Sequence, residues 1–330
     1  MRTTVTVAAL AAAAAQAQDL NQTIVGCVEV ECPAAADNVN DNCAIADTGS
    51  FPSIGLTRVP TGNSALSGLS WVKGFNITDS SSGRAFHSSF YLGTPPDLNL
   101  TNSTGACAVF LHGASGSLSF GQNETSATAQ GTCADAMGSS CVDALVSRAR
   151  TLVEGYAGED DRPSISDACA RLQKDLEDGR DDACASISGG DWNNFVGVDL
   201  TGEGAPQPLS QQQNASSTCW PVIPKQDELT LISEYQTPGS DLIEDAERAQ
   251  WAVTPVLTVF YSAGDGSLVT DVDASLSCIK TMGPARASLD TINDGSADPD
   301  SGATALLPSG SWIPIAFAAT LATIIVSYVS

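Results

Sequence analysis

All ten cysteines of this 330-residue chain lie between two apolar ends, and they constrain the fold more than any other feature. They are Cys27, Cys32, Cys43, Cys107, Cys133, Cys141, Cys169, Cys184, Cys219 and Cys278. A zinc site would need C-x-x-C pairs or clustered histidines, but the chain has no C-x-x-C pair and its two histidines, His87 and His112, are isolated. In an oxidising compartment such cysteines form disulfides. We therefore expect five structural disulfides, whose pairing the spacing leaves open.

The N-terminal end has the pattern of a secretory signal peptide. Arg2 supplies the positive start, Val5–Ala15 is an apolar run, and Ala15-Gln16-Ala17 is a small-x-small cleavage site. The apolar run is too short to span a hydrocarbon core of about 30 Å. We expect residues 1–17 to be removed, so that the mature chain begins at Gln18 and oxidises in the secretory pathway.

The C-terminal end has the pattern of a glycosylphosphatidylinositol (GPI) signal. Such a signal combines a small-residue triplet, a polar spacer and a hydrophobic tail. Ser301-Gly302-Ala303, the spacer Thr304–Ser311 and the apolar run Trp312–Val329 meet these requirements. A transmembrane helix would normally be followed by lysine or arginine, and none follows here. We expect a GPI anchor on Ser301, with Gly295-Ser296-Ala297 as the reserve triplet.

Six N-x-[ST] sequons predict N-glycosylation of a secreted chain. Their asparagines are Asn21, Asn76, Asn99, Asn102, Asn123 and Asn214. Each glycan requires a water-facing asparagine, so the sequons predict exposed loops. Asn99 and Asn102 are close enough to compete for occupancy.

The strongly acidic balance limits the partners of the chain. It has 14 basic and 38 acidic residues, a formal charge of -24, which repels phosphate backbones and anionic headgroups. We expect no nucleic-acid partner. The expected partners are the outer leaflet of the plasma membrane, reached through the lipid anchor, and cell-wall polysaccharide. Residues 284–311 are rich in Ser, Asp and Gly and contain few apolar side chains to bury. This composition predicts a flexible stalk.

The first part of the mature chain has the period-2 pattern of β-strands. The expected strands are Thr23–Val30, Leu69–Ile77, Ala85–Leu92 and Ala106–His112. Near the other end, Val256–Cys278 predicts a hairpin around Asp265-Gly266, a pair suited to a type I′ turn. On its second strand Asp271 and Asp273 are expected on the outer, solvated face, together with Val269, Ser275 and Ser277.

The middle of the chain has the period of α-helices. Val142–Tyr156 has one apolar face, and Ser164 precedes a second helix over Ile165–Leu176 that ends at Gly179. A short third helix is expected from Ser240. We expect the first two helices to form an antiparallel pair, joined by disulfides among Cys133, Cys141, Cys169 and Cys184. Residues 18–283 are thus predicted to form one α+β ectodomain, disulfide-stabilised, with a mostly β N-terminal half, a helical hairpin in the middle and a C-terminal β-hairpin.

The scarcity of histidine excludes several hydrolases. An α/β-hydrolase needs a histidine after its nucleophile, yet none follows His112 and no G-x-S-x-G occurs. Asp47-Thr48-Gly49-Ser50 resembles an aspartic-protease loop, but its only possible partner, Asp300-Ser301-Gly302, lies in the stalk. Because that mechanism needs two carboxylates that share a proton, we interpret Asp47–Ser50 as a turn.

Glycoside hydrolysis needs two placed carboxylates, and composition does not exclude it. The sequence singles out none of the eligible residues, which are Glu154, Glu177, Asp191, Asp227 and Glu228. Asp191-Trp192, followed by Asn193 and Asn194, is the one aromatic platform beside polar groups. We interpret its tryptophan as a buried corner residue.

Three segments carry a resemblance to a known group of proteins. They are Ser88–Pro96, Gly105–Phe110 and Gly131–Ala136. In these the chain resembles GPI-anchored cell-surface glycoproteins of filamentous ascomycete fungi. The resemblance implies a fungal cell-surface setting and no particular activity.

The sequence thus indicates a GPI-anchored cell-surface or cell-wall glycoprotein with a structural, adhesive or carbohydrate- or partner-binding role. It singles out no catalytic, cofactor-binding or metal site. The alternative is a wall-remodelling glycoside hydrolase or transglycosidase that uses an unidentified carboxylate pair.

Overall fold

The computed structural model describes part of the chain. The described residues are 23–27, 29–32, 42–81, 83–100, 103–115, 118–120, 127–157, 163–187 and 192–283. All belong to the first of two compact units, Met1–Gly295, and the second unit, Ser296–Ser330, lies outside them. Several predictions fall outside the described residues. They are the signal peptide, the stalk, the apolar tail, the anchor site Ser301 and the glycosylation sites Asn21, Asn102 and Asn123.

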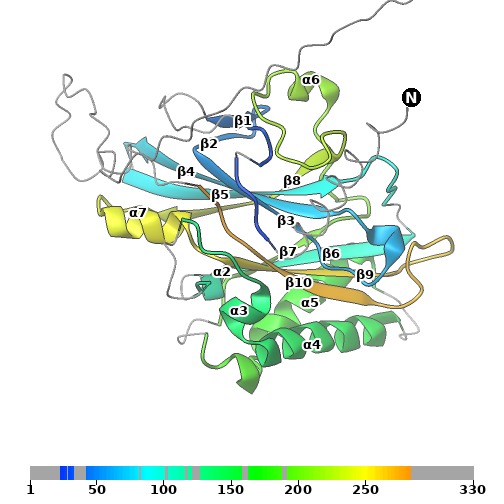
Figure 1. The fold of residues 1–330 in the computed structure, drawn as a ribbon. Helices are drawn as coiled ribbons and strands as arrows, with labels where there is room; N and C mark the ends of the chain where they lie inside the picture. Colours follow the sequence, from blue (N-terminus) through cyan, green and yellow to red (C-terminus); the bar gives the residue numbers. More distant parts are fainter. Residues whose placement is uncertain are drawn as a thin grey trace, which may run out of the picture. The chain divides into compact units, whose positions relative to one another are not determined.

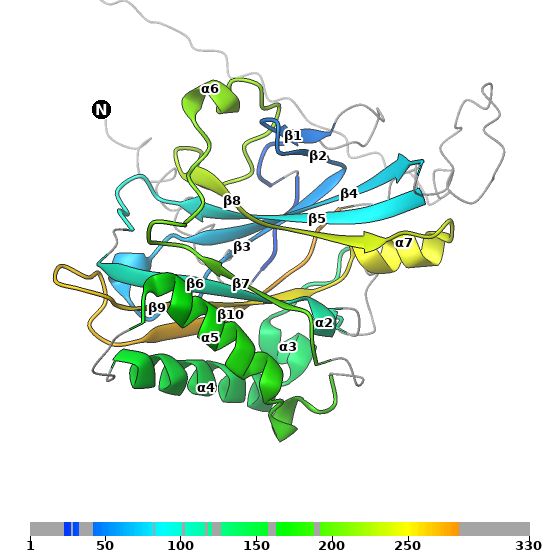
Figure 2. The ribbon, with the colours of Figure 1, turned by 180° about the vertical axis from the view of Figure 1, so that it is seen from behind.

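Two antiparallel four-stranded sheets form the centre of the first unit (Figure 1). The first sheet has the order β3-β4-β5-β8, with strands Ser53–Arg58, Ser70–Ser80, Gly83–Thr94 and Glu228–Pro238. The second has the order β10-β9-β6-β7, with strands Asp273–Ile279, Thr254–Ser262, Thr104–Leu111 and Phe195–Asp199. Figure 2 shows from behind that the sheets lie face to face. The described part contains mostly strands and a smaller share of helix, which confirms the predicted α+β class.

The core between the sheets is aromatic because alternate residues of each strand point to the same face. Trp71 and Phe90 from the first sheet pack against Phe110 and Phe260 from the second. The Trp71 and Phe110 rings meet edge to face at 5.4 Å, and the Trp71 indole donates a 3.1 Å hydrogen bond to Thr258 Oγ1. The bond satisfies the one polar atom of this buried side chain.

Helices cover the other face of the second sheet (Figure 1). They are α3 (Cys133–Met137), α4 (Ser139–Ala157) and α5 (Ile165–Asp178). The buried residues of α4 follow the predicted apolar face, as Leu145, Ala149 and Val153 show. Ser164 caps α5 by accepting a hydrogen bond from the Asp167 amide. Among the described residues, no helix combines the length and apolar character needed to cross a membrane.

Three disulfides join the helical layer together or to the sheet, which confirms that disulfide bonds are present. Cys107–Cys169 joins β6 to α5, Cys133–Cys278 joins α3 to β10, and Cys141–Cys184 joins α4 to the 3-10 helix η2, Asp182–Cys184. The expected pairing among Cys133, Cys141, Cys169 and Cys184 occurs between Cys141 and Cys184. Cys133 and Cys169 pair with strands instead, because α3 and α5 turn their apolar sides toward the sheet.

The remaining four cysteines lie together on the far side of the first sheet. Cys27, Cys32, Cys43 and Cys219 belong to one buried cluster. The Cα atom of Cys219 lies 5.0 Å from that of Cys32 and 4.8 Å from that of Cys43, so both are within disulfide reach. Since a sulfur atom forms one disulfide, Cys219 pairs with one of the two.

Shorter elements complete the described part. They are β1 (Cys43–Ile45), β2 (Gly49–Phe51), η1 (Ser64–Leu66), α2 (His112–Ser115), α6 (Gln211–Asn214) and α7 (Ile243–Gln250). Asp47 and Thr48 lie in the turn between β1 and β2, as interpreted for the protease-like tetrapeptide, whereas Gly49 and Ser50 belong to β2. The short helix expected from Ser240 is α7.

Two local predictions are wrong. Thr23–Val30 is not a strand, since it forms a single bridge, Val25 to Leu56, and then turns. Strands β9 and β10 pair as expected, but a loop over residues 263–272 joins them. Gly266 has a φ of 82°, whereas Asp265 is not in the positive region, so the two-residue type I′ turn does not form.

Candidate functional site

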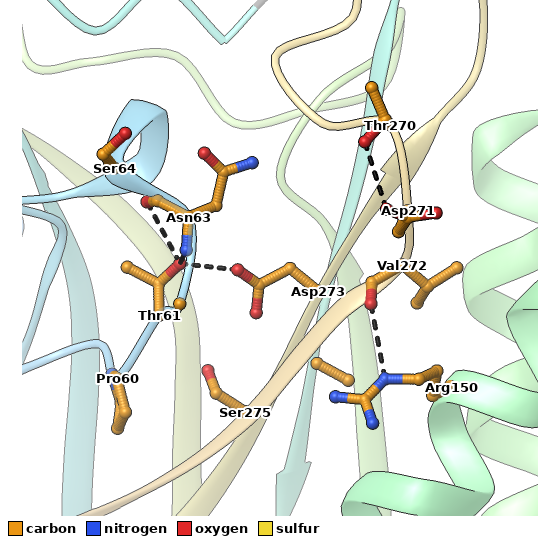
Figure 3. A pocket seen from close by; sticks show the side chains of 12 residues that line it. Pro60, Thr61, Asn63, Ser64, Arg150, Thr270, Asp271, Val272, Asp273 and Ser275 are labelled. Atoms are coloured by element: carbon orange, nitrogen blue, oxygen red, sulfur yellow. Dashed lines mark hydrogen bonds between the residues drawn. The ribbon is translucent and has the colours of Figure 1, made fainter.

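An open hollow of about 700 Å³ lies beside the start of β10. Three segments that are distant in sequence line it: the loop Pro60–Ser64 after β3, Arg150 on α4, and residues 270–275. Figure 3 shows polar side chains from all three segments around this space. We refer to it as the polar hollow.

The loop after β3 is held by hydrogen bonds of its own side chains. Asn63 Oδ1 accepts from the Ala65 amide and caps η1, while Asn63 Nδ2 donates to the Leu268 carbonyl at 3.2 Å. Thr61 Oγ1 donates to Asp273 Oδ2 at 2.6 Å (Figure 3). The loop is therefore fixed against the other wall of the hollow before any ligand arrives.

The pleat of β10 places Asp273 and Ser275 on the hollow and their neighbours in the core. Ala274 and Leu276 are buried against the helical layer. The predicted outer face of β10 is thus the face toward the first sheet. This face is accessible to solvent only at the start of the strand, where Asp273 and Ser275 are half-buried. The prediction fails for Ser277, which is buried farther along this face.

The prediction fails for Val269 as well. Its side chain is only 2% exposed and packs in the core between the sheets. The reason is that residues 263–272 form a loop, so the alternation of β10 does not extend back to Val269.

The charges around the polar hollow are mixed. Arg150 follows the buried Ala149 on α4 and is exposed, and its Nε donates to the Val272 carbonyl at 3.4 Å. Asp271 is exposed and accepts a 3.2 Å hydrogen bond from Thr270 Oγ1. One guanidinium, two carboxylates and several hydroxyls thus offer donors and acceptors to a hydroxyl-rich ligand, and the described lining contains no aromatic residue. No protein-family model, curated protein or solved structure matches this chain.

Of the five eligible carboxylates of the sequence analysis, the four that lie in the described part of the chain do not line the hollow. Glu154 is exposed on α4, and Glu177 Oε1 accepts a 2.7 Å hydrogen bond from the Phe195 amide. Glu228 is exposed at the start of β8. Asp191 lies outside the described residues.

Asp227 is the buried member of that set. Its carboxylate is 1% exposed, and burial raises the pKa of Asp227 to about 6 against the opposing effect of Arg58. The Arg58 guanidinium lies 3.8 Å from the carboxylate and also donates to the Gly68 and Ile223 carbonyls. Asp227 therefore belongs to a buried ion pair that joins the end of β3 to the loop before β8.

Trp192 packs as a corner residue. It is half-buried, its indole donates to the Leu176 carbonyl at 2.8 Å, and its ring meets Phe195 edge to face at 5.1 Å. Its neighbour Asn194 donates to the Tyr235 hydroxyl at 2.7 Å. These contacts tie the segment to α5 and β8.

Three sequons fall on described residues. Asn99 is exposed in the loop after β5, and Asn214 is the half-buried last residue of α6. Asn76 is half-buried on β4, one residue beyond the last pair with β3, Ser53 with Phe75. Their glycosylation stays a prediction.

The sequence analysis did not identify Thr61, Asn63 or Arg150. Pro60-Thr61-Gly62-Asn63-Ser64 is recognisable as a turn cluster. Nothing in the sequence, however, relates this turn to a strand more than 200 residues away, since that contact arises only when the sheets pack.

Proposed function

We propose that this protein is a non-catalytic cell-surface or cell-wall glycoprotein that binds a saccharide of the wall in the polar hollow. The observation that supports this most is the convergence of Thr61, Arg150 and Asp273 from three distant segments on one open space. Sugars present adjacent hydroxyls that both donate and accept hydrogen bonds. Paired carboxylate, guanidinium and hydroxyl groups match that pattern, and the fixed loop lowers the entropy cost of binding.

The proposal places this domain outside the cell. A signal peptide over residues 1–17 and a GPI anchor on Ser301 would hold it on the outer leaflet, with residues 284–311 as a spacer toward the wall. The displayed domain would combine a mostly β N-terminal half, a helical pair and a C-terminal hairpin. Treatment of intact cells with phosphatidylinositol-specific phospholipase C is expected to release it. Retention, with residues 312–330 still present by mass spectrometry, would contradict the anchor.

The binding proposal is tested by screening the full chain against a glycan array and a panel of wall polysaccharides. We expect selective binding, lost in Asp273→Asn and Arg150→Gln. Each change removes a charged hydrogen-bonding group, typically worth about 1.5–3 kcal/mol, which corresponds to roughly 10–100-fold in affinity. No binding to any saccharide would reject the proposal.

The second candidate is the glycoside hydrolase or transglycosidase. The observation that favours it is the presence of two carboxylates, Asp271 and Asp273, on the same hollow. The same polysaccharides, assayed for new reducing ends or transfer products, distinguish the two functions. Turnover that is abolished in both Asp271→Asn and Asp273→Asn would support the enzyme and replace the binding proposal.

A further inference from the structure

A second cavity, of about 210 Å³, lies between the two sheets at the end covered by α7. Its walls include Lys73, Phe75, Phe86, His112, Tyr235 and Arg248. Figures 1 and 2 both show α7 and α2 at this end of the sheets. We call it the Lys73 pocket.

Lys73 is an unusual residue for the middle of a buried strand. It is 1% exposed, and its ammonium group donates to the Ala252 carbonyl at 2.8 Å and to Thr254 Oγ1 at 3.1 Å. An ammonium carries three protons, so these two bonds leave one without an acceptor among the described residues. The described ion pairs include none with Lys73, although a buried charge normally has a carboxylate partner.

His112 adds a buried nitrogen without a partner. The side chain is 4% exposed, and no described residue is hydrogen-bonded to its Nε2. The ring is fixed by stacking on Tyr235, with centroids 3.9 Å apart and planes 4° from parallel. Burial and the nearby Lys73 lower the pKa of His112 to about 3, so the imidazole is neutral. In its Nε2-protonated tautomer it donates one hydrogen bond.

The charge of the pocket is opposite to that of the chain. Its ionisable lining residues are Lys73, His112, Tyr235 and Arg248, and the described lining contains no carboxylate, although the chain has a formal charge of -24. Arg248 stands at the rim, where its largely exposed guanidinium pairs with Asp245 at 3.2 Å. The rings of Phe75 and Phe86 make part of the wall apolar.

We infer that the Lys73 pocket binds a small organic monocarboxylate. The carboxylate accepts the remaining proton of Lys73 and the Nε2 proton of His112. The apolar body lies against Phe75 and Phe86. The volume suits a monocyclic or short aliphatic acid, and the ligand supplies the counter-charge that the described lining lacks.

The site predicts a specific pH dependence. Burial, and to a lesser extent the neighbouring Lys280, lower the pKa of Lys73 to about 7. The other ionisable groups of the lining are His112, Tyr235 and Arg248, and of these His112 stays neutral. Above pH 7, binding then requires proton uptake by Lys73, so the affinity falls by up to about tenfold per pH unit. Below pH 7 it stays constant until the ligand itself is protonated.

The test is calorimetric titration of the full chain with benzoate, acetate and the neutral isostere benzamide. We expect benzoate to bind more tightly than acetate, and benzamide to bind at least about tenfold more weakly than benzoate, the effect of losing one charged contact. Equal binding of benzoate and benzamide, or no heat with benzoate up to about 10 mM, the weak end of small-ligand affinity, would overturn the inference.

Two variants sharpen the test. Lys73→Met is expected to lose benzoate binding by tenfold or more, with circular dichroism as the check on folding. Lys280→Met removes the other buried amine, which does not line the pocket. The Lys280→Met variant should still bind benzoate. The pH at which its benzoate affinity declines should be higher, since one cause of the low pKa of Lys73 is gone. If the benzoate affinity of Lys280→Met declined at an unchanged or lower pH, Lys73 would not be the group that takes up the proton. This result does not depend on the Lys73→Met variant.

Discussion

Thr61 Oγ1 donates a 2.6 Å hydrogen bond to Asp273 Oδ2, although the two residues are 212 positions apart. The bond joins the loop after β3, in the first sheet, to the start of β10 in the second. With the bond from Asn63 Nδ2 to the Leu268 carbonyl, it fixes two walls of the polar hollow. Asp273 is thereby oriented by the fold, and the hollow is formed without a ligand.

Thr61→Val should destabilise the protein by about 1–2 kcal/mol, because a half-buried carboxylate loses its hydroxyl donor while the side chain keeps its shape. Urea unfolding measures the change. Thr270→Val is the matched control: its hydroxyl bonds the exposed Asp271 at 3.2 Å, so it should cost less than about 0.5 kcal/mol. Equal effects of the two variants would contradict the special role of the Thr61–Asp273 bond.

Removal of the β6–α5 disulfide should be costly. Cys107 and Cys169 are 62 residues apart, and closing a loop of that length is worth about 4 kcal/mol in the chain-entropy description. The double variant Cys107→Ala/Cys169→Ala should lose this amount in denaturant unfolding. A loss below about 1 kcal/mol would indicate that the two thiols are not bonded in the native protein.

Cys27, Cys32, Cys43 and Cys219 are expected to contribute two disulfides. Three of these thiols, Cys32, Cys43 and Cys219, lie within 4.8 Å of one another and form the one group among the described residues close enough for a metal. Peptide mapping without reduction should find Cys219 joined to Cys32 or Cys43, with Cys27 joined to the other. Free thiols after denaturation, together with bound zinc by elemental analysis, would contradict this.

Asp227 should make stability depend on pH in acid. Its pKa is raised from 3.8 in the unfolded chain to about 6 in the fold, so the folded state binds the proton more tightly. Its contribution to stability is complete below pH 3.8 and is lost as the pH rises through about 6. Asp227→Asn should flatten the unfolding free energy over this window relative to the parent protein. An unchanged slope would show that the carboxylate is not responsible.

Sequence patterns predicted the helices, because the spacing of apolar residues along a helix depends only on the helix itself. The sequence shows the apolar face of α4, and it shows both the N-cap and the apolar face of α5. A helix that is buried on one side repeats its apolar residues about every 3.6 positions. The strand prediction for Thr23–Val30 failed because its apolar residues are buried without forming a strand: Ile24 lies beside a single bridge and Val30 lies in a turn. A strand pattern reports burial and does not show whether a neighbouring strand is present.

The polar hollow was beyond prediction for a different reason. Asp273 was recognised as a polar residue on a strand, but its contact with Thr61 depends on how the two sheets stack. The disulfides show the same limit, since Cys133 pairs with Cys278 across 145 residues. Pairings of that range follow from tertiary packing, and cysteine spacing does not encode them.

The most direct test of the binding function is a titration of the best saccharide from the screen into three proteins: the parent, Asp273→Asn and Asp178→Asn. Asp178 is an exposed carboxylate on α5, paired with Lys174, and it serves as the charge-matched control. We predict a loss of about tenfold or more for Asp273→Asn and less than about twofold for Asp178→Asn. Equal affinity of Asp273→Asn and the parent would show that the saccharide binds elsewhere and would contradict the function proposed for the hollow.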